Sequence, residues 1–485
     1  MSSMSYTTRL VIYLRQSPHM LSRGLNLLDK RCYMTYNTLK ACNRSYSTRN
    51  ILKLHERGLW ADRFPDANTN DFIKELNSSP QTIYSGFDPT ADSLHVGNLL
   101  VLVTLLHCQR AGHNIITLVG GATAQVGDPS GRSSERPLLR SEEVCSNAYA
   151  IAETIRKIFK NHNEIFWDEE KESLPQLRIV DNSEWYNKLN VVDFLRIVGR
   201  NLRLGEMMSR TSVQSRLNSN EGISFTEFTY QALQAYDWLY LYDNYQCTIQ
   251  IGGSDQMGNL VSGHDLISRA RKKQVTGLTV PLITNESGNK FGKTAGNAVW
   301  LDSNKTSAFD FYQFFIRTAD ADVEKYLKLL TFNHLSDIEN IMKQHWIDPE
   351  KRLAQKKLAE NVTLLVHGKS GLDLARFATD ALYGGNPEGL IKMTAEEIKA
   401  VFKSAASASL ILHPGTSVLK MAMDAGCFID ERDARRIIKA GGFYINLARV
   451  NNPDLVLIPT AHILPNNISL LRVGKKNYYL VKWLM

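Results

Sequence analysis

The feature that most constrains this chain is the repeated pairing of a short β-rich run with a longer segment of helical spacing. Four runs rich in β-branched residues are expected to be buried strands: 82–84, 115–119, 178–180 and 248–251. Three segments between them carry apolar residues at helical intervals: 99–110, 142–159 and 192–198. Alternation of this kind predicts an α/β fold with a Rossmann-like, doubly wound, mostly parallel sheet.

Glycine-rich and polar motifs follow three of the predicted strands. They are Gly86-Phe87-Asp88-Pro89-Thr90, Gly120-Gly121-Ala122-Thr123 and Gly252-Gly253-Ser254-Asp255-Gln256. In a doubly wound sheet, ligands bind at the edge where strands end and loops begin. We therefore expect the three loops to line one ligand site.

Two further motifs suit a polyphosphate. His95-Val96-Gly97-Asn98 opens a helix, whose unpaired N–H groups and partial positive charge attract phosphate. The run 288–296 places Lys290 and Lys293 among glycines, as in a loop that closes on phosphates. Each motif alone is weak, because a His before a helix is more often a cap or core residue and such a loop is often a solvated turn. Together, on an α/β framework, they support nucleotidyl transfer.

The pattern changes after about Asp302, where helical segments run through roughly Phe402. His413-Pro414-Gly415 then marks a plausible linker, and from Thr416 onward Lys and Arg outnumber Asp and Glu by ten to five. The predicted domains are therefore a catalytic domain (47–301), a helical domain with a linker (302–413) and a small C-terminal α+β module (414–485). The longest apolar run is far shorter than the roughly 20 residues that span a membrane, so no membrane partner is expected.

The first 46 residues have the composition of an import leader. They hold seven Lys or Arg against one acid, a net +6 that leaves about +2 of the total +8 for the rest of the chain. An Arg-rich, Ser-rich and acid-poor start predicts mitochondrial import to the matrix, with cleavage after Tyr46. The alternative is a basic tail that carries no targeting signal. The six cysteines include no C-x-x-C pair, which predicts neither a structural zinc site nor a disulfide scaffold.

Taken in order, these motifs resemble those of the bacterial and mitochondrial tyrosyl-tRNA synthetases, which are class I aminoacyl-tRNA synthetases. The run 95–98 is similar to the HIGH motif, and Lys290-Phe291-Gly292-Lys293-Thr294 is similar to the KMSKS loop. Four more runs resemble the family: 84–95, 127–131, 230–237 and 252–256. The resemblance extends from about Gln81 through the C-terminal module. It implies activation of tyrosine by ATP, transfer to tRNA(Tyr) and a homodimer.

The resemblance also implies a tyrosine site. Tyr84 and Asp237 would hydrogen-bond the substrate hydroxyl, which separates tyrosine from phenylalanine. The substrate's ammonium would be held by Asp128, Tyr230 and Gln234, and its carboxylate would be steered by Gln256.

For ATP, the resemblance implies a larger set of residues. It consists of Gly86, Asp88, His95, Gly97, Asn98, Gly253, Asp255, Lys290, Lys293 and Thr294. Four side chains would stabilise the charge that builds on pyrophosphate: Thr90, His95, Lys290 and Lys293. Mg²⁺ would arrive with ATP rather than bind to the protein. Asn98 departs from the family, because many relatives carry His there.

The C-terminal module resembles the S-four-like RNA-binding domain that ends the bacterial-type enzymes. Ala434, Ile437 and Ile438 fall on one helical face. The residues expected to contact RNA are Arg432, Arg435, Arg436, Lys439, Lys475 and Lys476. A basic face that is merely solvated is the alternative.

Three rival functions remain. A tryptophanyl-tRNA synthetase is disfavoured by the pair Tyr84 and Asp237, and a small-molecule ligase by the C-terminal module. The third rival is a synthetase-derived RNA-binding or intron-splicing protein. The set Thr90, His95, Lys290 and Lys293 favours retained catalysis, with splicing left open as a second activity.

Overall fold

The structure is a computed structural model, and it describes residues 48–66, 68–132, 134–168, 173–283, 293–294, 297–383, 388–402, 405–474 and 477–484. The predicted leader and the residues Lys290, Lys475 and Lys476 lie outside these ranges. The chain forms two compact units. The first holds residues 1–90, 100–282 and 331–340, and the second holds 91–99, 283–330 and 341–485.

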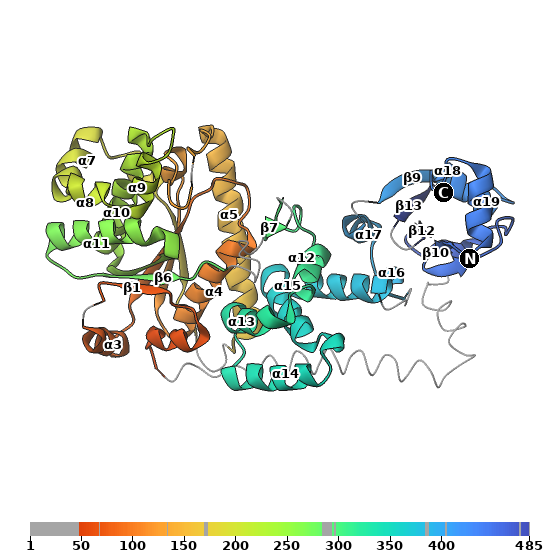
Figure 1. Ribbon diagram of the computed structural model, residues 1–485, viewed down its shortest axis with the longest axis horizontal. Helices are drawn as coiled ribbons and strands as arrows, with labels where there is room; N and C mark the ends of the chain where they lie inside the picture. The colour runs from red at the N-terminus through yellow and green to blue at the C-terminus, as the bar shows by residue number, and fades with distance from the viewer. Residues whose placement is uncertain are drawn as a thin grey trace, which may run out of the picture. The chain divides into compact units, whose positions relative to one another are not determined.

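A six-stranded sheet forms the centre of the first unit (Figure 1). Its strands are β1 (Asp62–Phe64), β2 (Thr82–Phe87), β3 (Asn114–Val119), β4 (Leu177–Asp181), β5 (Cys247–Gly253) and β6 (Thr276–Val280). They lie in the order β1-β6-β5-β2-β3-β4, with β1 antiparallel to β6 and the other neighbours parallel. The predicted fold class and the four predicted strands are therefore confirmed.

The strand order creates a switch point beside β2. From β2 the chain moves to β3 and β4 on one side, and later to β5 and β6 on the other. The crevice between diverging connections at such a point is where doubly wound sheets bind ligands. The loops after β2, β3 and β5 therefore meet there, as the sequence predicted.

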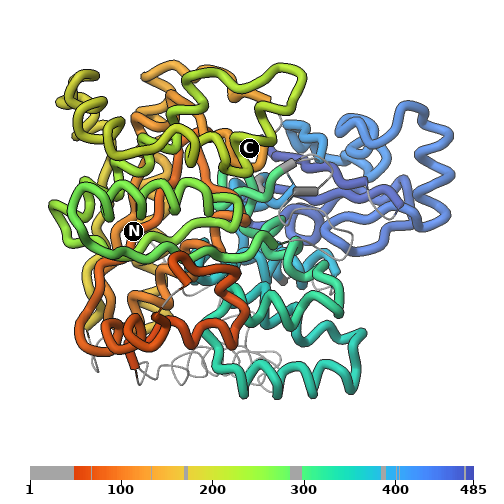
Figure 2. The backbone as a smooth tube through the Cα atoms, turned by 60° about the vertical axis from the view of Figure 1, so that its left-hand side comes forward, coloured from red at the N-terminus to blue at the C-terminus, as the bar shows by residue number. Residues whose placement is uncertain are grey.

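Helices surround this sheet. They are α3 (Thr69–Ser78), α4 (Val96–Arg110), α5 (Ser141–Asn161), α6 (Ser183–Tyr186), α7 (Val191–Ile197), α8 (Leu204–Met208), α9 (Thr211–Leu217), α10 (Phe225–Tyr245) and α11 (Met257–Arg271). Helices α10 and α11 pack side by side, as both views show (Figures 1 and 2). Helix α10 begins at Phe225, and the preceding Ser224 caps it, because the Ser224 hydroxyl accepts the Glu227 N–H at 3.2 Å.

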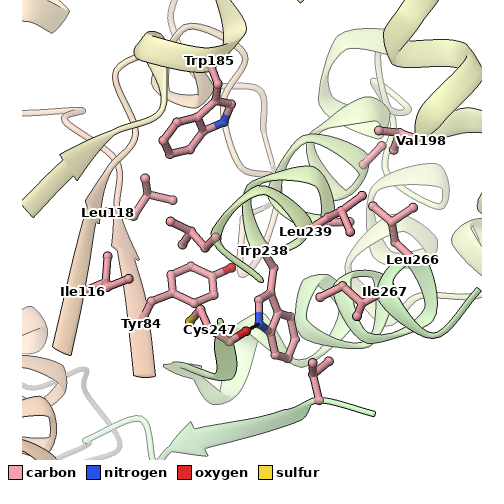
Figure 3. Packing of buried hydrophobic residues seen from close by; sticks show 14 of the residues in the cluster. Tyr84, Ile116, Leu118, Trp185, Val198, Trp238, Leu239, Cys247, Leu266 and Ile267 are labelled. Atoms are coloured by element: carbon pink, nitrogen blue, oxygen red, sulfur yellow. Dashed lines mark hydrogen bonds between the residues drawn. The ribbon is translucent and has the colours of Figure 1, made fainter. Parts of the chain in front are cut away.

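The core of the first unit centres on Trp238 of α10 (Figure 3). Its indole is fully buried and donates to the Cys247 carbonyl at 3.2 Å. The Tyr84 ring lies 6.1 Å from the Trp238 ring, so an aromatic from β2 packs directly on α10. Burial of rings of this size contributes a large part of the hydrophobic stabilisation of such a core.

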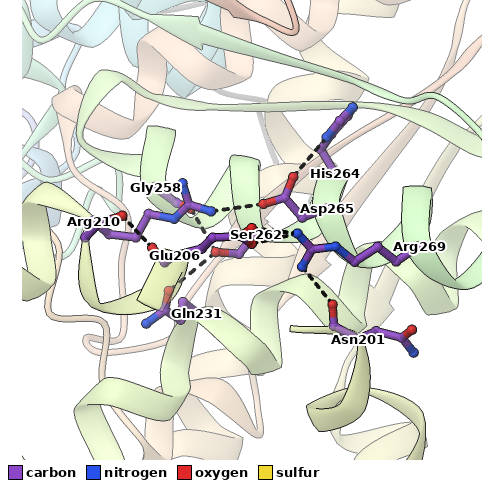
Figure 4. Close-up of polar contacts among 10 residues, drawn as sticks. Asn201, Glu206, Arg210, Gln231, Gly258, Ser262, His264, Asp265 and Arg269 are labelled. Atoms are coloured by element: carbon purple, nitrogen blue, oxygen red, sulfur yellow. Dashed lines mark hydrogen bonds and ion pairs between the residues drawn. The ribbon is translucent and has the colours of Figure 1, made fainter. Parts of the chain in front are cut away.

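Ion pairs hold the short helices α8 and α9 onto α11 (Figure 4). Arg210, which precedes α9, contacts Asp265 of α11 at 3.1 Å, and Asp265 lies 3.4 Å from His264. Arg269 of α11 reaches both carboxylate oxygens of Glu206 in α8, at 2.8 and 2.7 Å. Paired bonds of this geometry fix orientation as well as distance.

The second unit is mostly helical at first. Its elements are the hairpin β7 (Lys293–Thr294) and β8 (Asn297–Ala298), then α12 (Ala308–Ile316), α13 (Asp320–Leu330), α15 (Leu353–Tyr383), α16 (Glu388–Ile391) and α17 (Ala395–Val401). Helix α14 (Leu335–Ile347) is divided between the two units. Helix α15 packs on α12 and is interrupted at Gly368, whose φ is 74°.

A five-stranded sheet completes the second unit. It contains β9 (Ala406–Ile411), β10 (Phe443–Ile445), β11 (Ala448–Val450), β12 (Ile468–Val473) and β13 (Asn477–Leu484), in the order β11-β10-β12-β13-β9. Helices α18 (Val418–Asp424), α19 (Glu431–Lys439) and α20 (Pro459–His462) accompany it. Strand β9 lies before the predicted linker at 413–415 and pairs parallel with β13. In the described ranges, no helix is both long and apolar enough to cross a membrane.

Candidate active site

A buried tyrosine hydroxyl belongs to β2, in the interior of the six-stranded sheet. Tyr84 of β2 is fully buried, and among the described residues its hydroxyl has no hydrogen-bond partner. Burial, together with the nearby charge of Asp237, raises the pKa of Tyr84 well above its usual value. Buried polar atoms are nearly always paired in proteins, so a hydroxyl without a partner among the described residues is uncommon.

Asp237 of α10 is held by two neighbours. Its carboxylate accepts from Asn182 Nδ2 at 3.1 Å and from Trp185 Nε1 at 2.9 Å. Burial raises the pKa of Asp237 to about 8, although these two hydrogen bonds act to lower it. The carboxyl is therefore a fixed polar group in apolar surroundings, which suits recognition of a single ligand hydroxyl.

A second carboxyl, Asp88, lies just after β2. It accepts from the Tyr230 hydroxyl at 2.7 Å and from the Thr123 hydroxyl at 2.8 Å. Burial raises the pKa of Asp88 to about 6, against the lowering effect of these hydrogen bonds. Tyr230 was expected beside a ligand ammonium and Asp88 beside the nucleotide, and the structure brings the two into direct contact.

Asn182, which follows β4, connects the two carboxyls. Its Nδ2 donates to Thr123 at 3.0 Å as well as to Asp237, and its Oδ1 accepts the Ala122 N–H at 2.8 Å. A continuous chain of hydrogen bonds thus runs from Asp88 through Thr123 and Asn182 to Asp237. Each buried group in this chain is paired, which makes the arrangement rigid.

The glycine pair after β3 makes room for this network. A Cβ at Gly120 would overlap the Asp88 carboxylate and the Thr123 hydroxyl. A Cβ at Gly121 would lie 2.5 Å from an oxygen of Asp181. The glycines are therefore required by the close approach of polar side chains to the backbone.

Asp128 joins the loop after β3 to the loop after β5. Its carboxylate accepts from Gln256 Nε2 at 2.7 Å and from the Ser130 N–H at 3.0 Å. Asn259 of α11 donates to the Gln256 amide oxygen at 3.0 Å, which orients that amide. Gln256 and Asp128, both predicted to face the tyrosine substrate, are thus neighbours.

Two arginines that sequence reasoning missed lie next to Asp128. Arg136 donates from Nε to the Asp128 carbonyl at 3.2 Å, and its charge acts to lower the pKa of Asp88. The pKa of Arg132 is lowered by burial and by the charge of Arg136. A pair of guanidinium groups at such a place can hold a polyphosphate. Their only signal in the sequence is their position in the loop after Gly127-Asp128-Pro129-Ser130-Gly131.

The remaining predicted residues of the first unit occupy the same strand ends. Gln234 is half-buried on α10, and because 230, 234 and 237 are four and seven positions apart, they share one helical face. Gly86 is exposed within β2. The Thr90 N–H donates to the Asp88 carbonyl at 2.8 Å. A Cβ at Gly253 would lie 2.5 Å from Asp255 Oδ1.

His95, Gly97 and Asn98 lie at the start of α4, in the second unit. His95 Nδ1 accepts the Gly97 N–H at 3.0 Å, so in the neutral ring Nε2 carries the proton and is a donor. A Cβ at Gly97 would lie 2.8 Å from the His95 ring, which explains the glycine. Asn98 Oδ1 accepts the His95 N–H at 3.0 Å and thereby helps to fix the histidine backbone.

The lysine loop is described only in part. Lys290 lies outside the described residues, and for Lys293 and Thr294 only the backbone, in β7, is described. The predicted roles of the three side chains therefore stay predictions.

The predicted RNA-binding face on α19 is partly neutralised. Arg435 pairs with Glu431 at 3.0 Å and with Asp454 at 2.8 Å, and Arg436 pairs with Asp433 at 3.0 Å. Arg432 and Lys439 are exposed. Sequence reasoning missed another cation of this module, the guanidinium of Arg472 on β12, which lies 3.9 Å above the Tyr444 ring. Register pairs the two residues across β10 and β12, a contact that the sequence alone could not reveal.

Comparison with known proteins agrees with this geometry. The family model "tRNA synthetases class I (W and Y)" matches residues 76–384, and the model "Tyrosine--tRNA ligase SYY-like C-terminal domain" matches residues 397–481. The chain therefore belongs to the class I tRNA synthetases of the tryptophan and tyrosine group.

Its relatives point to the tyrosine branch of that group. The mitochondrial tyrosine–tRNA ligase of Drosophila melanogaster is 54% identical over 450 residues, which cover 92% of this chain and 97% of that protein. The mitochondrial tyrosine–tRNA ligase of Homo sapiens is 51% identical over 433 residues, covering 88% and 90%. These relatives support the synthetase and not the alternative of an RNA-binding or splicing protein.

A solved structure gives the same result. The C-terminally truncated mitochondrial tyrosyl-tRNA synthetase of Aspergillus nidulans matches with a TM-score of 0.62 and 33% identity. The match covers 70% of this chain and 95% of that one.

Proposed function

We propose that this chain acts in mitochondria as a tyrosine–tRNA ligase. It activates tyrosine with ATP to give tyrosyl-adenylate and pyrophosphate, and then transfers tyrosine to the 3′ end of tRNA(Tyr). The observation that carries this function is the buried hydroxyl of Tyr84, which has no hydrogen-bond partner among the described residues, together with the buried carboxyl of Asp237, whose charge acts on it, in a chain of this family. We propose the matrix as its compartment, on the composition of the first 46 residues.

The pocket selects tyrosine by its hydroxyl. Tyr84 and Asp237 both offer polar atoms in an apolar core that includes Trp238. With phenylalanine bound, the Tyr84 hydroxyl would stay unpaired and the Asp237 carboxyl would keep only its bonds to Asn182 and Trp185, at a cost that tyrosine avoids. Tyrosyl-tRNA synthetases are the standard example of this selectivity. In that family the kcat/KM for tyrosine exceeds that for phenylalanine by about 10⁵, a value that belongs to the family and not to this structure.

The ammonium group of tyrosine would be held by acceptors at the strand ends. Asp128 provides a buried carboxylate, and Tyr230 and Gln234 share one face of α10. The contact between Tyr230 and Asp88 brings a second carboxyl to this group, which adds to the attraction for a cation. Gln256, oriented by Asn259, would steer the reacting carboxylate.

Activation needs no covalent enzyme intermediate. An oxygen of the tyrosine carboxylate forms a bond to the α-phosphorus of Mg-ATP, and the bond from that phosphorus to the pyrophosphate oxygen breaks. No proton is transferred, so catalysis consists of positioning and of stabilising the leaving charge. The donors proposed for this task are Thr90, His95 through Nε2–H, Lys290 and Lys293, with Arg132 and Arg136 as additional cations.

The transfer step requires a bound tRNA. We propose that the C-terminal module contacts the RNA through exposed cations, including Arg432 and Lys439 on α19. Arg435 and Arg436 are held in ion pairs, so an RNA phosphate must compete with their carboxylate partners. This favours a contact of moderate strength that weakens as salt rises.

We further propose a homodimer formed through an apolar surface of the first unit. Large apolar side chains are exposed on and near α7, α8 and the start of α10: Leu138, Val191, Val192, Leu195, Leu204 and Phe225. Phe225 is 80% exposed and Val191 is 70% exposed, and exposed apolar side chains that lie together mark interaction surfaces. A second copy of the chain is the occupant that the family resemblance suggests.

The test is tyrosine-dependent exchange of labelled pyrophosphate into ATP by the protein without its first 46 residues. We expect exchange with tyrosine, none with tryptophan or phenylalanine, and loss of exchange in the Lys293→Ala variant. If the well-folded protein gives no exchange with tyrosine, the proposal that it is a tyrosine–tRNA ligase is refuted.

A further inference from the structure

Two segments far apart in the sequence run antiparallel where α4 begins. The Val96 N–H donates to the Val299 carbonyl at 2.9 Å, and the Leu301 N–H donates to the Leu94 carbonyl at 2.8 Å. Between these bonds, His95 and Trp300 face each other as a bridge pair. The histidine proposed to contact phosphate is therefore held on a short two-stranded ribbon, and Trp300 is its cross-strand neighbour.

The side chains on this ribbon form a connected set. The Trp300 ring lies 6.4 Å from the His95 ring at an angle of 57°. Lys305 Nζ lies 4.8 Å above the Trp300 ring and also pairs with the Asp92 carboxylate. The hydroxyl of Thr306 accepts the Trp300 N–H at 3.0 Å, which fixes the tryptophan backbone. Asp92, Trp300 and Lys305 are called the clamp below.

The clamp is placed to orient His95 rather than to stabilise the fold. The side chains of Lys305 and Asp92 are 32% and 51% exposed, and ion pairs so exposed add little to stability. Yet Lys305 reaches the tryptophan that packs beside the imidazole, and Asp92 holds that lysine in an ion pair. The Gly97 N–H donates to Nδ1 of His95, which fixes one side of the imidazole ring. The Trp300 ring of the clamp lies beside the same imidazole and limits its rotation. Together they determine where the Nε2–H points.

Resting on the proposed function, we propose that Asp92, Trp300 and Lys305 are positioning residues for tyrosine activation. They hold the His95 imidazole in the orientation that donates to the polyphosphate. Donors that stabilise a transition state must already be in place, and a misplacement of about 1 Å costs up to about a hundredfold in rate. The clamp therefore affects kcat of activation through His95 and leaves tyrosine binding unchanged.

The first experiment uses Lys305→Met in the otherwise unchanged protein. We expect kcat for tyrosine-dependent pyrophosphate exchange to fall about tenfold or more, with KM for tyrosine unchanged. The matched control is Lys328→Met, which removes a lysine from a similarly exposed pair with Glu324, with exposures of 33% and 42%. The control should retain wild-type kcat.

Two further variants separate positioning from a general loss of structure. In Lys305→Arg, which keeps a cation for the Trp300 ring and for the Asp92 carboxylate, kcat should recover most of the loss seen in Lys305→Met. In a His95→Gln background, Lys305→Met should cause no additional loss, because groups that act through one residue are not additive.

The outcomes distinguish the two proposals. If the wild-type protein gives no exchange with tyrosine, the proposed function fails and the clamp proposal fails with it. If the wild type is active but Lys305→Met keeps wild-type kcat, the clamp proposal alone is overturned. The same holds if Lys305→Met lowers kcat equally with and without His95, since the lysine then does not act through the histidine.

Discussion

The buried carboxyl of Asp237 ties the proposed tyrosine pocket to the pH dependence of stability. Burial raises its pKa from 3.8 to about 8. In the unfolded chain the same group titrates near 4. Between about pH 4 and pH 8 the folded protein therefore binds a proton that the unfolded chain has released. Stability is lost as the pH rises through this range, and the loss is complete above the folded pKa.

The size of the effect follows from the shift. About four pKa units correspond to at most roughly 6 kcal/mol, at about 1.4 kcal/mol per unit. Relaxation and water entry around a buried charge reduce this figure, and the charge of Asp88 contributes to the shift of Asp237. In Asp237→Asn the group no longer ionises, and its one amide oxygen can accept from Asn182 or from Trp185 but not from both, because these donors bond different oxygens of the carboxyl group. The variant therefore starts from a lower stability, and the comparison concerns only the change with pH. When the pH is raised from 5 to 9, the free energy of unfolding should fall in both proteins. The fall should be several kcal/mol smaller for the variant than for the wild type.

Thermal unfolding followed by tryptophan fluorescence measures this difference, because Trp185 and Trp238 belong to the same core. The midpoint of the wild type should fall by several degrees more than that of Asp237→Asn between pH 5 and pH 9. The control is Asp243→Asn, on the same helix, whose carboxylate is partly exposed and paired with Arg271 at the surface. Parallel curves for wild type and Asp237→Asn would refute the assignment of the buried, proton-binding carboxyl to this residue.

Four other predictions concern separate parts of the molecule. Tyr84→Phe should lower kcat/KM for tyrosine about fivefold in the exchange assay, because it removes one neutral hydrogen bond of roughly 1 kcal/mol. The ratio of kcat/KM for tyrosine to that for phenylalanine should fall with it. Arg216→Met should destabilise the fold by about 3–5 kcal/mol in thermal unfolding, because it leaves Glu227 charged without its partner in a pair that is 2% exposed on both sides. Phe225→Asp should convert the proposed dimer to monomers in sedimentation velocity, and an unchanged sedimentation coefficient would contradict the proposed surface. Arg472→Gln should weaken tRNA binding in a filter assay and leave tyrosine-dependent pyrophosphate exchange unchanged, while equal tRNA affinity would show that the stacked arginine has only a structural role.

The parts of the site that sequence reasoning found are those with a local pattern. Glycine-rich loops after predicted strands located the strand ends, and the resemblance assigned Tyr84, Asp128 and Asp237 to tyrosine. The structure places Tyr84 within β2, Asp128 in the connection that follows β3 and Asp237 on α10, although their roles stay predictions. Asn182 was missed, although it lies two residues after the predicted strand 178–180 and directly after β4, because a lone asparagine at a strand end carries no distinctive spacing. Its importance arises only from contacts with residues 59 and 55 positions away.

What the sequence determined by itself is the architecture and the membership of the family. Strand and helix periodicity, and glycines where loops must pass close to side chains, are local properties that a single chain records. The tertiary structure alone decided which polar groups meet: Tyr230 with Asp88, Asn182 between two carboxyls, and Lys305 over Trp300 beside His95. The physical reason is that pKa values and hydrogen-bond partners depend on burial and on neighbours brought together by sheet order. These are non-local quantities that no window of sequence contains.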